Sequence, residues 1–447
     1  MKTTTDQLAS YRALIASKDS LLRQENLIKN ADFGRGLGAE AIGVHWVQIP
    51  PGQRSSNPHA ESHEEECVFV VTGQPHVWIN GYIYLLEPGM IVGFPAGTGI
   101  AHCIINNSEA TVELVVIGER TKEENKCAFP LNPEFKEKQK DLWWHDWPEQ
   151  KLGPHDGTVG NLDHQRDPLE LPYIRRLGDL SRPDSTPYPD DTETFGDGVR
   201  FTDDVGLKAL GVWHEILAPG RRSSWPHAHR RDEEFAVILN GNAKVWLNGF
   251  LFDIKAGDGV YYKPGTNISH TLLNESCESV EYLAIGQNSA REPMDQIVYP
   301  LHSTRNEICR VSGRLWENPP KQQIFGSHLG LPKQAHVRIQ LFESAQSFLD
   351  SIGSMLYKDE AENGLMLGSL NEDPSTYLAV YQQDELVGAA LVTPKNLVLT
   401  RMSGPILVDL AQFLLDRNSI FGGVVGPSYA SETFARIWSQ FASKHFN

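Results

Sequence analysis

Short runs of apolar, mostly β-branched residues alternate with turn signals over residues 40–290. In the first half of this region the runs cover residues 68–71, 77–79, 91–94 and 104–105. Asn80-Gly81 separates two apolar stretches, and Asn248-Gly249 repeats the arrangement. Asn-Gly in this position is a strong signal for a β-hairpin. Many short strands at even spacing predict a mostly β fold of the double-sheet jelly-roll type.

The pattern occurs twice, because residues 44–118 align with residues 212–286 at a constant offset of 168 and without a gap. The positions that the copies share are rich in glycine, histidine and glutamate. In the first copy they include Pro51-Gly52, His59, Glu65-Glu66, Gly73, Asn80-Gly81, Gly89, His102 and Asn106. An internal repeat predicts two similar barrels, and these residue types indicate turns and a polar site.

The second copy reads Gly220, six residues, His227-x-His229, four residues, Glu234, six residues, Gly241; then Gly257, six residues, Pro264-Gly265, four residues, His270, three residues, Asn274. Histidines at i and i+2 of a strand point to the same face. The spacing resembles the two-motif signature of the cupin superfamily, with the second motif two residues longer. The resemblance implies a barrel in which His227, His229, Glu234 and His270 bind a metal ion. A metal-free barrel is the alternative.

Three imidazoles and one carboxylate inside a barrel are costly to bury unless something pairs with them. A divalent metal ion supplies that pairing. Nitrogen and oxygen ligands suit Fe, Mn, Ni, Cu or Zn, so the residues do not select the ion. We expect a divalent ion such as Fe, Mn, Ni or Zn.

The first copy departs from this pattern at one of its four positions, which are His59, Glu61, Glu66 and His102. A carboxylate replaces one imidazole, and a set of two histidines and two carboxylates still suits a hard or borderline ion. His63 lies two residues beyond Glu61 as an alternate ligand. The other interpretation is that this copy has lost its site and serves as a structural partner.

Each copy also carries an Arg-Ser-Ser run ahead of the histidines, with Arg54 and Arg222 as its first residues. An arginine beside a metal holds a substrate carboxylate by a bidentate contact, so Arg222 is our candidate catalytic residue. An arginine that bridges strands at the barrel rim is the alternative. Both copies resemble a bacterial group of small cupins that share the run Phe-Pro-Ala-Gly-Thr-Gly, intact here at residues 94–99. That group has no settled reaction.

Composition limits the partners and the compartment. The formal net charge of -17 argues against binding nucleic-acid phosphates. No apolar run approaches the roughly 18 residues that a membrane span needs, and residues 1–30 lack the features of a signal peptide. Five cysteines without a CxxC spacing fit a reducing cytoplasm. We therefore expect a cytoplasmic protein that binds a small molecule and neither nucleic acid nor membrane.

The chain divides by its patterns into an N-terminal packing helix (1–30), a first barrel (31–160), a linker (161–198), a second barrel (199–332) and a small α/β domain (333–447). In this last domain the order of elements, with Tyr377-Leu-Ala-Val and the run 385–394, resembles the N-terminal half of a GCN5-related N-acetyltransferase. The basic-x-x-Gly-x-Gly loop that holds CoA in that family is missing. We expect the half domain to pair with a second copy, giving a homodimer, or to cover a barrel.

Three functions are consistent with these features. The first is a metal-dependent enzyme acting on a small organic substrate: an oxygenase, decarboxylase, lyase or isomerase. The second is a bicupin that binds or senses a small ligand without turnover. The third is an acyl-CoA-dependent N-acetyltransferase, which the missing CoA loop disfavours.

Overall fold

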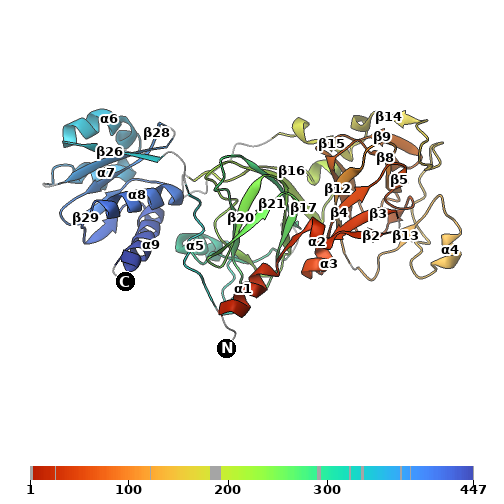
Figure 1. Cartoon of the computed structure of the whole chain (residues 1–447), viewed down its shortest axis with the longest axis horizontal. Coiled ribbons are helices and arrows are strands. Elements are labelled where there is room, and N and C mark those ends of the chain that lie inside the picture. Colours follow the sequence, from red (N-terminus) through yellow and green to blue (C-terminus); the bar gives the residue numbers. More distant parts are fainter. Residues whose placement is uncertain are drawn as a thin grey trace.

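The structure is a computed structural model that describes residues 4–25, 27–120, 122–181, 193–288, 293–321, 324–333, 337–372, 375–382 and 384–445. Three units lie in a row along the molecule (Figure 1). Two β-barrels form one end and the middle, and a small α/β domain forms the other end. The mostly β fold that the sequence predicts is confirmed. Among the described residues, no helix is long and apolar enough to cross a membrane.

The first barrel consists of two packed sheets with strand orders β15-β10-β7-β12-β4-β3-β2 and β14-β9-β8-β11-β5. Its central strands are β4 (Ile42–Ile49), β5 (Gln53–Arg54), β7 (Glu66–Thr72), β8 (His76–Ile79), β9 (Tyr82–Leu85), β10 (Met90–Phe94), β11 (His102–Asn106) and β12 (Val112–Glu119). Asn80 and Gly81, at φ 46° and 85°, form the predicted hairpin turn between β8 and β9. Valines 68, 70 and 92 pack in the core between the sheets.

The second barrel repeats this arrangement with sheets β1-β22-β19-β24-β17-β16 and β21-β20-β23. Its strands are β16 (Asp197–Arg200), β17 (Leu210–Leu217), β19 (Glu234–Asn240), β20 (Asn242–Leu247), β21 (Phe250–Lys255), β22 (Asp258–Tyr262), β23 (His270–Leu273) and β24 (Val280–Gln287). The register repeats too: Val112 pairs with Ile49 in the first barrel, and Val280 pairs with Leu217 in the second. The internal repeat of the sequence is thus a repeat of strand pairing.

The N-terminal segment differs from the single helix that we expected. Helix α1 (Thr4–Arg12) is followed by β1 (Ile15–Ser17), α2 (Lys18–Leu21), β2 (Arg23–Glu25), β3 (Ile28–Asp32) and α3 (Phe33–Leu37). Strand β1 pairs with β22 of the second barrel, whereas β3 pairs with β4 of the first. Both strands satisfy backbone groups that a sheet edge would leave open. The segment therefore belongs to both barrels, and its Tyr11 and Phe33 are buried in the core that they share.

Part of the predicted linker is also barrel structure. Strand β14 (Gln165–Arg166) pairs in parallel with β9, and β15 (Ile174–Arg176) pairs with β10 of the first barrel. These strands cover sheet edges, as β1 does in the second barrel, and such short strands leave no periodic signal in the sequence. Residues 182–192 of the predicted linker lie outside the described residues.

The C-terminal domain has a five-stranded sheet in sequence order, β26-β27-β28-β29-β30. The strands are β26 (Val337–Phe342), β27 (Thr376–Gln382), β28 (Glu385–Val392), β29 (Asn396–Leu399) and β30 (Gly423–Val425). Helices α6 (Ala345–Lys358) and α7 (Glu360–Ser369) pack on one face of the sheet, and α8 (Gly404–Asp416) and α9 (Ser428–His445) pack on the other. The predicted α/β character is present, with α7 as an unexpected helix. The resemblance to an acetyltransferase stays a prediction.

Candidate metal centre

Strand ends of the second barrel position the four predicted ligands. His229 ends β18 (Ala228–His229), and His227 precedes this strand and pairs with His270 across a β-bridge. Glu234 begins β19, and His270 begins β23. Because each residue lies at or beside the end of a strand, the hydrogen bonds between strands fix the position of its Cα atom.

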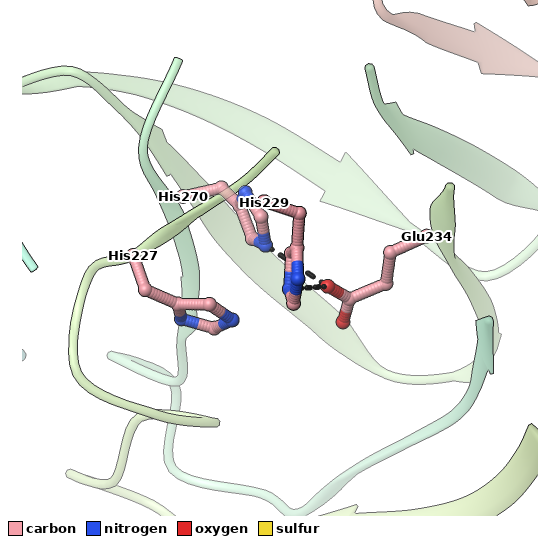
Figure 2. A group of neighbouring side chains, drawn as sticks. All are labelled: His227, His229, Glu234 and His270. Atoms are coloured by element: carbon pink, nitrogen blue, oxygen red, sulfur yellow. Dashed lines mark hydrogen bonds and ion pairs between the residues drawn. The ribbon is translucent and has the colours of Figure 1, made fainter. Parts of the chain in front are cut away.

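Figure 2 shows the three imidazoles and the carboxylate converging. One ligand atom from each residue lies within 4.8 Å of the others. Glu234 Oε2 is 3.0 Å from His229 Nε2 and 3.1 Å from His270 Nε2. The rings of His227 and His270 are 4.7 Å apart, centre to centre. The structure thus brings together all four residues that the sequence singled out.

Outer contacts hold the imidazoles in orientation. His227 donates its Nδ1 hydrogen to the Trp225 carbonyl oxygen at 2.8 Å, and His229 donates its own to Asp295 Oδ2 at 2.8 Å. Tyr262 stacks on His270 at 3.7 Å between ring centres. A carboxylate or carbonyl on the distal nitrogen is the usual outer shell of a metal-binding histidine. These contacts leave Nε2 of His227 and His229 for the centre of the cluster.

The charges of the cluster follow from burial and from mutual contacts. Burial lowers the pKa of His227 to about 3, with a further contribution from His270 and His229. Burial also lowers the pKa of His270. For His229 burial acts in the same direction, but the hydrogen bond to Asp295 and the adjacent Glu234 carboxylate outweigh it and raise the pKa to about 10. Burial disfavours the Glu234 anion, yet contacts with His229 and His270 hold its pKa well below the usual value.

The donor set fits a divalent cation. The raised pKa means that His229 is protonated at neutral pH unless a cation displaces its Nε2 proton. In the neutral ring Nδ1 keeps the hydrogen that it gives to Asp295, and Nε2 carries the lone pair. Nε2 lies 3.0 Å from Glu234 Oε2 without the alignment of a hydrogen bond. A cation at the centre would accept this lone pair together with those of His227, His270 and Glu234. Three nitrogens and one oxygen suit borderline divalent ions.

A cavity of about 180 Å³ adjoins the cluster. His227, His229 and Glu234 line one side of it, and Trp213, Ala284, Ile285 and Ile297 give it an apolar wall. For comparison, an apolar cavity of roughly 150 Å³ accommodates benzene. The space therefore suits a small organic molecule in contact with the ligand residues.

The first barrel brings its four candidate residues together less closely. His102 Nε2 is 3.6 Å from Glu66 Oε1, and the rings of His59 and His102 are 5.0 Å apart. Burial, with Glu66 and Glu64 nearby, raises the pKa of Glu61 to about 8. Among the described residues, three or more ligand atoms gather within 4.8 Å only in the second barrel. The alternate ligand His63 is exposed and contacts Ser62, so it does not join the cluster.

Glu61 nevertheless has a partner suited to it. Asn125 occupies the place of Asp295, because each lies two residues before the strand residue that pairs with Glu61 or His229. Both accept a backbone N–H in the same way, Asn125 from His63 at 3.0 Å and Asp295 from Arg231 at 2.9 Å. Asn125 also hydrogen-bonds the Glu61 carboxylate. The two domains thus differ at both positions of this pair. The second domain has a histidine (His229) beside an aspartate (Asp295), and the first has a glutamate (Glu61) beside an asparagine (Asn125).

The sequence model of the family described as "Cupin domain" matches residues 45–118 and 213–286, the two segments that form the barrels. The chain contains two cupin domains. None of the curated proteins matches the chain.

Solved structures with a similar arrangement include an oxalate decarboxylase of Lactobacillus farciminis in complex with formate, 16% identical with a TM-score of 0.44 over 69% of this chain and 96% of that chain. They also include a mutant oxalate decarboxylase of Bacillus subtilis, 16% identical with a TM-score of 0.43 over 69% of this chain and 87% of that chain.

The second cupin domain does not use Arg222 as predicted. Arg222 pairs with Leu273, three residues after His270, so its side chain lies on the opposite face of the sheet from His270. There the guanidinium forms two 2.7 Å hydrogen bonds to the Glu193 carboxylate and one of 2.9 Å to the Gly330 carbonyl. Arg222 is buried in this ion pair rather than exposed to the cavity, so the expected contact with a substrate carboxylate is wrong.

A pair of glutamates that the sequence analysis did not interpret joins the two cupin domains. Glu233 precedes the candidate ligand Glu234, and its carboxylate accepts the backbone N–H groups of residues 40–42 at 2.7–3.0 Å. Glu65 precedes Glu66 and accepts those of residues 208–210 at 2.8–3.3 Å. The Glu-Glu run that occurs in both copies was the feature of the sequence that could have indicated these contacts. Its first residue ties the barrels together, and its second faces the candidate metal centre.

Proposed function

We propose that the second cupin domain holds one divalent metal ion through His227, His229, Glu234 and His270, and that the ion acts on a small organic substrate in the adjoining cavity. The observation that carries the proposal is the convergence of four candidate ligand atoms within 4.8 Å beside a cavity of about 180 Å³. The bound ion would serve as a Lewis acid or a redox centre. An oxygenase, decarboxylase, lyase or isomerase remains the reaction class that we infer.

The roles of the residues follow from their contacts. Asp295 keeps a hydrogen on His229 Nδ1 and so directs the other nitrogen inward. The Trp225 carbonyl does the same for His227. The apolar wall, formed in part by Trp213 and Ile285, provides a surface against which the carbon skeleton of a small organic substrate can pack.

Metal stoichiometry tests the proposal. Protein purified without a histidine tag, reconstituted separately with Fe, Mn, Ni and Zn, is compared by elemental analysis with its His229→Ala variant. We expect one ion per chain, falling to none in the variant, and no change in a His63→Ala control, which removes an exposed histidine. Two ions falling to one would add the first domain and make Glu61 a ligand.

Two results would contradict the proposal. Full metal content at the second domain after His229→Ala would remove these residues from the site. The absence of any bound metal would favour the alternative, a bicupin that binds a small ligand without turnover. Acyl transfer remains the least favoured function, because the CoA loop is missing from the sequence.

A further inference from the structure

One residue beside the metal centre is held by the C-terminal domain. Trp225 presents its carbonyl oxygen to His227 Nδ1 at 2.8 Å, while its ring, 2% exposed, lies in an aromatic cluster outside the centre. His302 stacks on that ring at 3.7 Å between ring centres, and Tyr429 stacks on His302 at 4.8 Å. Tyr429 belongs to helix α9 of the C-terminal domain. A continuous series of contacts therefore runs from α9 to a ligand of the proposed metal ion.

Other contacts fix α9 against the second cupin domain. The buried Arg222 extends to the Tyr429 hydroxyl at 3.4 Å, in addition to its ion pair with Glu193. Ser303, the first residue of α5 (Ser303–Val311), donates its hydroxyl hydrogen to Glu432 at 2.6 Å. Arg436 donates to the Leu301 carbonyl. Tyr429 is thus placed by polar contacts on both sides of the stack, and α9 packs against the second cupin domain.

The first cupin domain offers an internal comparison. Asn57 stands at the position of Trp225, and its carbonyl accepts the Nδ1 hydrogen of His59 at 2.9 Å, as in the second domain. Arg54 donates to the Asn57 side chain at 2.5 Å in place of an aromatic stack. The backbone contact is common to both domains. The aromatic stack on Trp225 belongs to the second domain, which is also the domain whose candidate ligand atoms converge.

We propose that the C-terminal domain is a working part of the metal centre: Tyr429 and His302 hold Trp225, whose carbonyl orients the His227 imidazole toward the ion. Tyr429 and His302 are positioning residues, since they act through Trp225. The inference rests on the proposed metal site and extends it, because it makes metal affinity of the second domain depend on α9. Loss of an outer contact of a metal ligand typically weakens metal binding about 10- to 100-fold.

The test measures Co²⁺ affinity by competition with a chromophoric chelator and records the visible absorption of the bound ion, which reports its coordination geometry. We expect Tyr429→Ala to weaken Co²⁺ binding about tenfold and to alter the absorption spectrum. Tyr429→Phe keeps the ring and should restore affinity to within about twofold of the wild type. Tyr357→Ala, which removes a 57% exposed tyrosine of the same domain, is the matched control and should leave both readouts unchanged.

A second variant covers the case in which Tyr429→Ala does not fold. His302 caps α5 by accepting the Arg305 N–H at 3.0 Å, and asparagine can make the same cap without the ring. His302→Asn should therefore weaken Co²⁺ binding in a folded protein. If the wild type binds Co²⁺ and neither variant changes affinity or spectrum, the inference is overturned while the proposed function stands. If the wild type binds neither Co²⁺ nor any of Fe, Mn, Ni and Zn, both are overturned.

Discussion

Replacing Glu233 by glutamine is expected to destabilise the paired barrels by about 2–4 kcal/mol. The Glu233 carboxylate is 4% exposed and accepts four hydrogen bonds. Its Oε1 accepts from Glu40 N at 2.7 Å and from the Tyr261 hydroxyl at 2.9 Å, and its Oε2 accepts from Ala41 N and Ile42 N at 3.0 Å. An amide has one oxygen, so its nitrogen must face at least one backbone N–H. Each buried donor left without a partner costs about 1–3 kcal/mol, and the remaining bonds lose their charge.

The equivalent change at Glu65 should cost less, about 1–2 kcal/mol, for a geometric reason. Glu65 Oε2 accepts from all three backbone donors, Lys208 N, Ala209 N and Leu210 N. Oε1 accepts only from Lys208 N, which it shares with Oε2. An amide oxygen in the Oε2 position therefore keeps every donor paired. The two substitutions are chemically identical, yet the structure ranks Glu233→Gln as the more damaging.

The assay is urea unfolding followed by tryptophan fluorescence, because Trp46, Trp78 and Trp246 are buried in the barrels. Glu109→Gln, at an exposed turn position of the first barrel, makes the same chemical change without an interface. The reasoning would be refuted if Glu233→Gln unfolded within about 0.5 kcal/mol of this control, the range of an ordinary surface substitution. A larger loss for Glu65→Gln than for Glu233→Gln would refute the oxygen-by-oxygen account.

Three further predictions concern the candidate metal centre of each domain and a buried carboxyl group of the C-terminal domain. Asp295→Asn should weaken metal binding at the second domain about 10- to 100-fold, measured by chelator competition, because His229 loses its anionic acceptor; unchanged affinity would show that Asp295 does not support His229. Glu61→His combined with Asn125→Asp should raise metal content by one ion per chain, since it gives the first domain the residue types of the second; unaltered content by elemental analysis would contradict this. Asp409→Asn in α8 should raise the free energy of unfolding at pH 8, measured in urea, by less than about 3 kcal/mol, because burial raises the pKa of Asp409 to about 6 and its ionised form is costly above that pH, while solvent screening of this partly exposed side chain reduces the full value. The gain should disappear below about pH 4, where aspartate is protonated in both the folded and unfolded states; a gain that persists there would not come from ionisation.

The convergence of His227, His229, Glu234 and His270 was predictable from the sequence, because their spacing matches the cupin pattern and local spacing on strands determines which side chains share a face. His227 and His229 illustrate this, and the Asn80-Gly81 turn shows the same for local backbone geometry. Asp295 could not be predicted, since it lies in an irregular segment 66 residues after His229. The role of Glu233 could not be predicted either, because it binds backbone N–H groups, which every residue except proline carries. The role proposed for Arg222 failed because its partner Glu193 comes from a segment without a recognisable pattern.

The position of β1 affects the order in which the chain can fold during its synthesis. Ile15 pairs with Val260, so a strand near the start of the chain must wait for a partner made 245 residues later. At roughly 5–20 residues per second, translation takes about 12–50 s to cover this distance. During that interval residues 15–17 have no sheet to join, although β3, a few residues further on, can already pair within the first barrel. Removing the first 17 residues should therefore expose the β22 edge of the second barrel and leave the pairing of β3 with β4 in place.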